Sequence, residues 1–132
     1  VSGRVKEFCP DGYPQDEPLV PHGMSVVLNA PAVFRWTAQA DPDRHLRMAE
    51  AMGADVRDAD PADAGNLLAE RVIGLMRATG MPNGLSAIGY GEDDVDLLVE
   101  GTLPQHRVTK LSVRPAGEKE LAALFKDAMQ YW

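Results

Sequence analysis

The chain has 132 residues, enough for one domain with a single core. Hydrophobic residues make up 45% and charged residues 25%, a balance that excludes disordered, collagen-like and coiled-coil proteins. Thirteen basic residues against twenty acidic ones leave a net charge of −7, which repels phosphate backbones and anionic lipids. Nucleic acid and membranes are therefore not expected partners.

No secretory signal is visible in the first residues. The chain begins at Val1 without a methionine or an apolar secretory stretch, and its longest apolar run, residues 25–34, is shorter than the ~20 residues of a membrane span. We therefore expect Val1 to be an internal position of a longer gene product. The single cysteine, Cys9, cannot form an internal disulfide, which agrees with the reducing cytoplasm and predicts a cytoplasmic protein.

The chain opens with a proline-rich loop and continues as a helix. Residues 9–22 contain four prolines, which predict irregular structure. Apolar residues with helical spacing then predict a helix over about residues 23–36. Pro31 lies within this helix and is expected to kink or locally unwind it, because proline supplies no amide hydrogen.

The next two helices have matching start signals. Asp41 and Asp60 are each followed by proline, the pairing of an N-cap with a first-turn proline. Gly53 and Gly80 mark the ends of the two helices. The second of them has a regular i, i+4 apolar pattern over about five turns.

The remainder of the chain also reads as helices and connectors. A turn at 81–84 and a packed connector at 85–90 precede three consecutive acids, which favour a helix start and predict a helix over 92–101. An extended piece around 107–114 is then followed by Pro115 and Gly117, which introduce a last helix with a buried stripe from Leu121 to Met129. Because no alternating strand pattern is present, the sequence predicts an all-α domain of about five helices, preceded by the proline-rich N-terminal loop.

One acidic motif resembles a metal site only superficially. Asp58, Asp60 and Asp63 imitate part of a calcium loop, but Asp63 stands where that loop requires glycine and no glutamate closes it. We interpret these residues as a turn and a helix start.

The three histidines differ in their surroundings. His22 lies just before a predicted helix, where the positive end of the backbone dipoles favours the neutral imidazole, the form that binds metals. The alternative is that His22 only caps or packs the helix entry. His45 lies in the polar segment 43–47 and is predicted to be solvated, and His106 could line a cleft. Neither has the spacing from His22 that one metal site requires.

Several segments resemble a known family. Segments 18–28, PLVPHGMSVVL, and 30–34, APAVF, resemble the C-terminal part of the iron-containing (group III) alcohol dehydrogenases, and are most similar to the hydroxyacid-oxoacid transhydrogenase branch. The similarity extends over essentially the whole chain. Further matching motifs are RHL at 44–46, AE at 49–50, MGAD at 52–55, DAG at 63–65, GLSAIGY at 84–90 and GTLPQHRVTKL at 101–111.

The resemblance implies that residues 1–132 are the C-terminal helical, metal-site domain of a dehydrogenase. In that family an N-terminal domain binds NAD(P), and Fe²⁺ or Zn²⁺ lies in the cleft between the domains, bound by one aspartate and two or three histidines. The last ligand is the histidine of a Pro-His-Gly segment, which corresponds to His22. The other ligands and the nucleotide loop would precede Val1, so we expect no catalytic or cofactor-binding residue within this chain.

The implied reaction interconverts an alcohol or hydroxyacid and the corresponding carbonyl, for example 4-hydroxybutyrate with 2-oxoglutarate as acceptor. Arg107 and Lys110 are candidates to bind the substrate carboxylate, and a surface role is the alternative. The chain alone should be inactive and bind metal weakly, because one imidazole is not a complete site. An apolar patch near His22 and Phe34 would favour a homo-oligomer. A different class, a stand-alone acidic all-α interaction module without catalysis, stays open.

Overall fold

The computed structural model describes residues 1–132, the side chain of Val108 excepted. Within these residues it contains six α-helices and no β-strand, which confirms the predicted all-α fold. The helices are α1 (His22–Thr37), α2 (Pro42–Ala51), α3 (Ala64–Ala78), α4 (Val95–Thr102), α5 (His106–Thr109) and α6 (Glu118–Asp127). Short 3₁₀ helices are η1 (Ser2–Arg4), η2 (Pro61–Asp63), η3 (Ser86–Ile88) and η4 (Glu92–Asp94).

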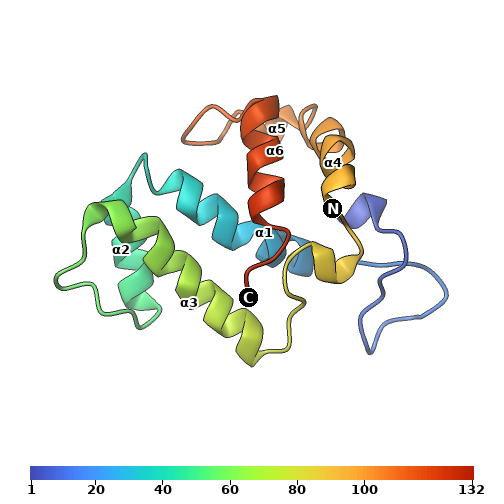
Figure 1. Ribbon diagram of the computed structural model, residues 1–132, viewed down its shortest axis with the longest axis horizontal. Coiled ribbons are helices and arrows are strands. Elements are labelled where there is room, and N and C mark those ends of the chain that lie inside the picture. The colour runs from blue at the N-terminus through green and yellow to red at the C-terminus, as the bar shows by residue number, and fades with distance from the viewer.

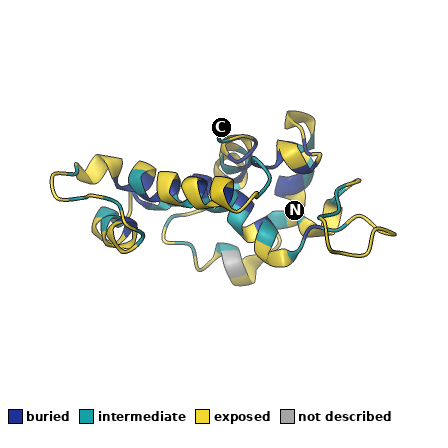
Figure 2. Ribbon diagram, turned by 90° about the horizontal axis from the view of Figure 1, so that it is seen from below, coloured by how far each residue is buried: buried dark blue, intermediate teal, exposed yellow. Residues whose placement is uncertain are grey.

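Helix α1 is the central element of the fold. It packs against α3 and α6, while α2 packs on α3 and α4 packs on α6 (Figure 1). The buried residues follow the inner faces of these helices, and the N-terminal loop is largely exposed (Figure 2). The largest fully buried side chains are Leu28, Leu68, Met76, Leu85, Ile88, Val20 and Pro31.

The predicted helix starts at Asp41 and Asp60 are confirmed. The carboxylate of Asp41 accepts a hydrogen bond from the amide of Arg44 at 3.1 Å, and that of Asp60 accepts one from the amide of Ala62 at 2.8 Å. Each carboxylate thereby satisfies an amide that has no partner within the helix. The regular part of α3 begins after the 3₁₀ turn η2.

Three details differ from the sequence prediction. Helix α1 is continuous through Pro31, because the loss of one amide donor is outweighed by the packing of this helix on α3 and α6. Helix α4 continues past Gly101 to Thr102. One helical turn, α5, occupies part of the segment predicted as extended, with the amide of Thr109 bonded to the carbonyl of Gln105 at 3.1 Å.

The C-terminal residues are bonded to the turn that follows α3. The side-chain oxygen of Asn83 accepts hydrogen bonds from the amides of Tyr131 and Trp132, at 2.8 and 3.2 Å. Gly84 has a φ of +72°, and a Cβ atom there would lie 2.6 Å from the carbonyl oxygen of Ala128. Only glycine fits this close approach of two backbones. The turn and the chain end thus hold α3 and α6 together.

Candidate functional site

His22 is the first residue of α1, and its side chain is exposed. Pro21 occupies the N-cap position, so His22 does not cap the helix. No hydrogen bond to the imidazole is formed by the side chains that the structure describes, whereas the carbonyl of His22 accepts one from the Ser25 hydroxyl at 2.8 Å. The ring nitrogens of His22 are therefore available to a group outside this chain.

An open groove of about 470 Å³ lies beside α1, between this helix, α6 and the first residue of the chain. Helix positions four, seven and eleven residues after His22 share its face, and these are Val26, Asn29 and Val33, all of which line the groove. The full lining comprises Val1, Ser25, Val26, Asn29, Ala30, Val33, Phe34, Thr102, Leu121, Leu124 and Phe125. His22 thus lies on the helix face that forms one wall of the groove.

The groove walls are mainly apolar. Asn29 donates its side-chain amide to the carbonyl of Ser25 at 2.7 Å, and the Ser25 hydroxyl is bonded to His22. Among the described residues, no buried side-chain nitrogen or oxygen lacks a hydrogen-bond partner. Val26, in contrast, is 55% exposed although it is aliphatic. The groove therefore suits an apolar partner better than a small polar molecule.

The prediction that His45 is solvated was wrong. His45 is buried, with its Nδ1 atom 2.7 Å from the carbonyl oxygen of Asp41 and its Nε2 atom 2.8 Å from the hydroxyl of Thr37. Its ring packs edge-on against Phe34. The neighbours of His45 in sequence are polar, but His45 and Ala49 are one helical turn apart and form the buried face of α2. The i, i+4 spacing of His45 and Ala49 could have indicated that His45 is buried, but its polar neighbours in sequence indicated exposure.

The other candidate residues lie on the surface. His106, Arg107 and Lys110 are all exposed. Within the described residues, no three histidine, cysteine or acidic side chains come close enough together to hold a metal ion. For the metal that the resemblance implies, the chain thus offers His22 as a single exposed donor. An exposed imidazole on an open face fits one ligand of a site whose other ligands lie elsewhere.

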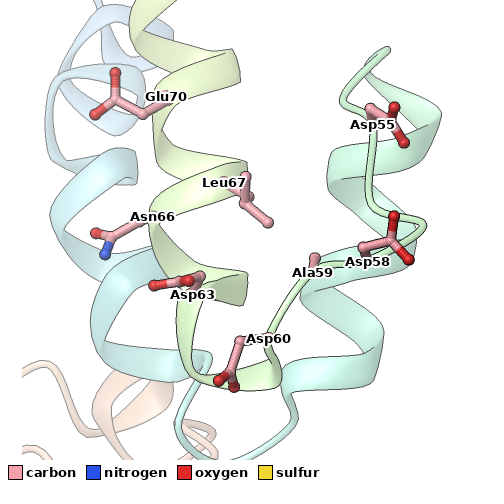
Figure 3. A pocket seen from close by; sticks show the side chains of 8 residues that line it. All are labelled: Asp55, Asp58, Ala59, Asp60, Asp63, Asn66, Leu67 and Glu70. Atoms are coloured by element: carbon pink, nitrogen blue, oxygen red, sulfur yellow. The ribbon is translucent and has the colours of Figure 1, made fainter.

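A second hollow, of about 580 Å³, is acidic (Figure 3). Asp60 caps the start of η2, and Asp55 is paired with Arg57 at 2.6 Å. Both are exposed, and the labelled carboxylates do not converge on a common point in Figure 3. This agrees with the interpretation of the Asp58 to Asp63 segment as a turn and helix start. Its lining residues are Asp55, Asp58, Ala59, Asp60, Asp63, Asn66, Leu67 and Glu70.

Comparison with known proteins identifies the family. A family model described as the C-terminal part of the Fe-containing alcohol dehydrogenases matches residues 19–129, a span that includes His22 and the groove-lining part of α1. The chain belongs to the iron-containing alcohol dehydrogenase family. None of the helices described in this family member is long and apolar enough to cross a membrane.

The relatives agree with this assignment. The chain is 52% identical over 130 residues to a probable mitochondrial hydroxyacid-oxoacid transhydrogenase of Dictyostelium discoideum, covering 98% of the chain and 24% of that protein. It is 50% identical over 132 residues to the mitochondrial hydroxyacid-oxoacid transhydrogenase of Homo sapiens, covering 100% of the chain and 28% of that protein. The chain therefore spans about a quarter of the length of these relatives.

A solved structure has the same fold. A crystal structure of 1,3-propanediol oxidoreductase matches the chain with a TM-score of 0.75 and 27% sequence identity. The match covers 83% of this chain and 28% of that one. The helical arrangement around α1 is therefore also found in that enzyme.

Proposed function

We propose that the chain is the C-terminal helical domain of a metal-dependent, NAD(P)-linked oxidoreductase that interconverts a hydroxyacid and an oxoacid. In this proposal an N-terminal nucleotide-binding domain of the same polypeptide completes the enzyme. The similarity to hydroxyacid-oxoacid transhydrogenases over the whole chain supports this substrate class. The substrate pair expected from the resemblance is 4-hydroxybutyrate with 2-oxoglutarate.

The observation that carries the proposal is the placement of His22. Its imidazole is exposed at the first turn of a 16-residue helix, on the face that lines an open apolar groove. We propose that His22 supplies one ligand to Fe²⁺ or Zn²⁺, and that the remaining ligands come from the N-terminal part of the protein. A metal held there would supply a Lewis acid for the substrate oxygen, and a bound nicotinamide would supply the hydride acceptor or donor.

The residues of this chain have a positioning task in that reaction. The backbone of α1 fixes the origin of the His22 side chain, since its carbonyl is bonded to Ser25 and the helix packs on α3 and α6. The apolar wall of the groove lies beside this helix. Once the groove is covered, this wall would exclude water from the cleft, and the exclusion of water strengthens electrostatic interactions there.

The test uses the full-length protein with His22→Ala, and His106→Ala as the control, because both imidazoles are exposed. Metal content is measured by plasma mass spectrometry after dialysis, alongside 4-hydroxybutyrate oxidation. We expect the dialysed His22→Ala protein to retain much less than one metal ion per chain and to lose activity, while His106→Ala retains both. Stoichiometric metal in the His22→Ala protein would exclude His22 as a ligand.

The isolated 132-residue chain provides a second test. A stable site needs three or four ligands, and the chain contributes one imidazole. We therefore expect the dialysed chain to retain no iron or zinc and to oxidise no hydroxyacid. A stoichiometric metal ion bound through His22 in this chain would contradict the proposal that the other ligands lie elsewhere.

Two further expectations belong to the same proposal. Arg107 and Lys110 are exposed. A side chain that binds substrate at the surface of a domain has to be accessible before the cleft closes, and both residues meet this condition. Full-length Arg107→Ala and Lys110→Ala would show a raised KM for 4-hydroxybutyrate if either binds its carboxylate. A cytoplasmic location stays a prediction, and the relatives above are named as mitochondrial proteins.

A further inference from the structure

The groove beside α1 is a mainly apolar surface that the described residues leave open. We propose that it binds the polypeptide that immediately precedes Val1 in the longer protein, as an apolar segment seated against Val26 and Val33. This inference rests on the proposed function, in which the chain is the C-terminal part of a larger enzyme. The further inference specifies the surface on which the preceding segment docks.

The position of Val1 is the first argument. Val1 lines the groove and is half-buried, and its carbonyl accepts hydrogen bonds from the Tyr90 hydroxyl at 2.6 Å and the Arg4 amide at 3.0 Å. Lys6 is bonded to Asp94 at 2.7 Å, which fixes the same segment to η4. A residue preceding Val1 would therefore leave from the groove wall itself.

The chemistry of that position agrees. Burial lowers the pKa of the α-amino group of Val1, and the nearby Arg4 lowers it further. A charged amine is thus disfavoured at this place, whereas the neutral amide of a peptide bond is not.

The lengths also fit. About three quarters of each relative lies outside the region matched by this chain, and the matching family model describes a C-terminal part. From His22 to Val33 the helix face extends about 16 Å, at 1.5 Å per residue. About five residues of extended chain span that distance. A short segment before Val1 would suffice to cover the stripe that begins at His22.

A second copy of this chain is a less suitable cover. Each copy has a net charge of −7, so two copies repel each other. The groove also has no free buried polar group to fix a polar ligand. An apolar segment of the same polypeptide pays no such penalty and is held at high effective concentration.

The test compares Val26→Cys with Leu75→Cys in the full-length protein. Val26 and Leu75 are each 55% exposed aliphatic helix residues in this structure, but Leu75 does not line the groove. Maleimide labelling of each thiol is followed by peptide mass mapping, in native and in urea-unfolded protein. We expect the native Val26→Cys thiol to react at least about tenfold more slowly than the Leu75→Cys thiol. Equal native rates would overturn the proposal.

The occupant is identified by photo-crosslinking from p-benzoyl-phenylalanine placed at position 26 of the full-length protein. We expect crosslinks to peptides that directly precede Val1 in the same molecule. Crosslinked dimers, crosslinks only within residues 1–132, or crosslinks only to distant parts of the N-terminal domain would each overturn the proposal. The metal content of the Val26→Cys protein distinguishes failure of the groove proposal from failure of the metal-site proposal. A freely reacting thiol in a metal-loaded protein refutes only the cover over the groove. A protected thiol in a protein that never binds metal refutes only the metal site.

Discussion

The hydroxyl of Tyr131 donates a hydrogen bond to the carbonyl oxygen of Leu28, 2.9 Å away and three residues before Pro31. The guanidinium of Arg35, four residues after Pro31, lies 5.9 Å from the centre of the same tyrosine ring. Tyr131 therefore contacts α1 on both sides of its proline. Pro31 removes the helical donor to the carbonyl one residue before Leu28, so Tyr131 stabilises α1 beside that gap and connects the C-terminal residues to the helix that begins at His22.

We expect Tyr131→Phe to lower the free energy of unfolding of the 132-residue chain by about 1 kcal/mol, since it removes one hydrogen bond and keeps the ring. Urea denaturation followed by circular dichroism measures the change. Tyr13→Phe is the control, because Tyr13 is 45% exposed in the N-terminal loop. Equal effects of the two substitutions would show that the bond to Leu28 contributes nothing.

The same residue predicts a response to alkaline pH. Burial raises the pKa of Tyr131 to about 12, above the ordinary value of 10. The folded state therefore favours the neutral phenol, and the stability that Tyr131 contributes is complete below pH 10 and is lost as the pH rises to about 12. Urea denaturation of wild type and Tyr131→Phe at pH 8, 10 and 11 should show a difference that narrows with pH. A constant difference would contradict this.

Two glycines of α3 should respond oppositely to alanine. A Cβ atom at Gly65 would lie 2.8 Å from the Cα of Arg35 and 3.0 Å from the Cβ of Ala38, so Gly65→Ala pushes α3 away from α1. We expect a loss of about 1 to 3 kcal/mol in the free energy of unfolding. A Cβ atom at Gly74 meets nothing within 4 Å, so Gly74→Ala should add up to about 1 kcal/mol of helix stability.

Thermal denaturation of both variants checks this pair. The expected result is a lower Tm for Gly65→Ala and a higher Tm for Gly74→Ala than for the wild type. If both variants shift in the same direction, close packing at the crossing of α1 and α3 is not the reason for glycine at position 65.

The buried histidine gives a further prediction. His45→Ala removes a side chain bonded to both Thr37 and the backbone of Asp41, and it leaves a gap beside Phe34. We expect it to destabilise the chain by about 1 to 3 kcal/mol, measured by urea denaturation. His106→Ala, at an exposed position, should change stability by no more than about 0.5 kcal/mol. A neutral His45→Ala variant would show that these contacts do not stabilise the corner between α1 and α2.

Local signals predicted most of the helices, and long-range packing accounts for what they missed. The aspartates at 41 and 60 act within three residues of their position, so the sequence alone identified both starts. The burial of His45 depends on which face of α2 meets the rest of the domain, and its polar neighbours suggested the opposite. The one-turn helix α5 is too short for a periodic pattern to indicate it.

The candidate site was likewise predicted in part, from local sequence, and missed in part, where it depends on long-range packing. The Pro-His-Gly segment identified His22 as a candidate, and the structure places it at the first residue of α1 rather than just before the helix. The groove was not predicted beyond an apolar patch near Phe34, because its walls combine α1 with Leu121 and Phe125, about a hundred residues later in the chain. Single-sequence patterns contain no information about such pairings.

Pro31 and its neighbours also bear on protein engineering. The part of α1 before Pro31 forms much of the groove wall, whereas the part after it makes the close crossing with Gly65 of α3. If the groove binds the segment before Val1 as proposed, variants at Val26 and Asn29 would alter that contact without disturbing the crossing. Affinity between the two portions of the protein and resistance to heat would then be adjustable by separate sets of substitutions.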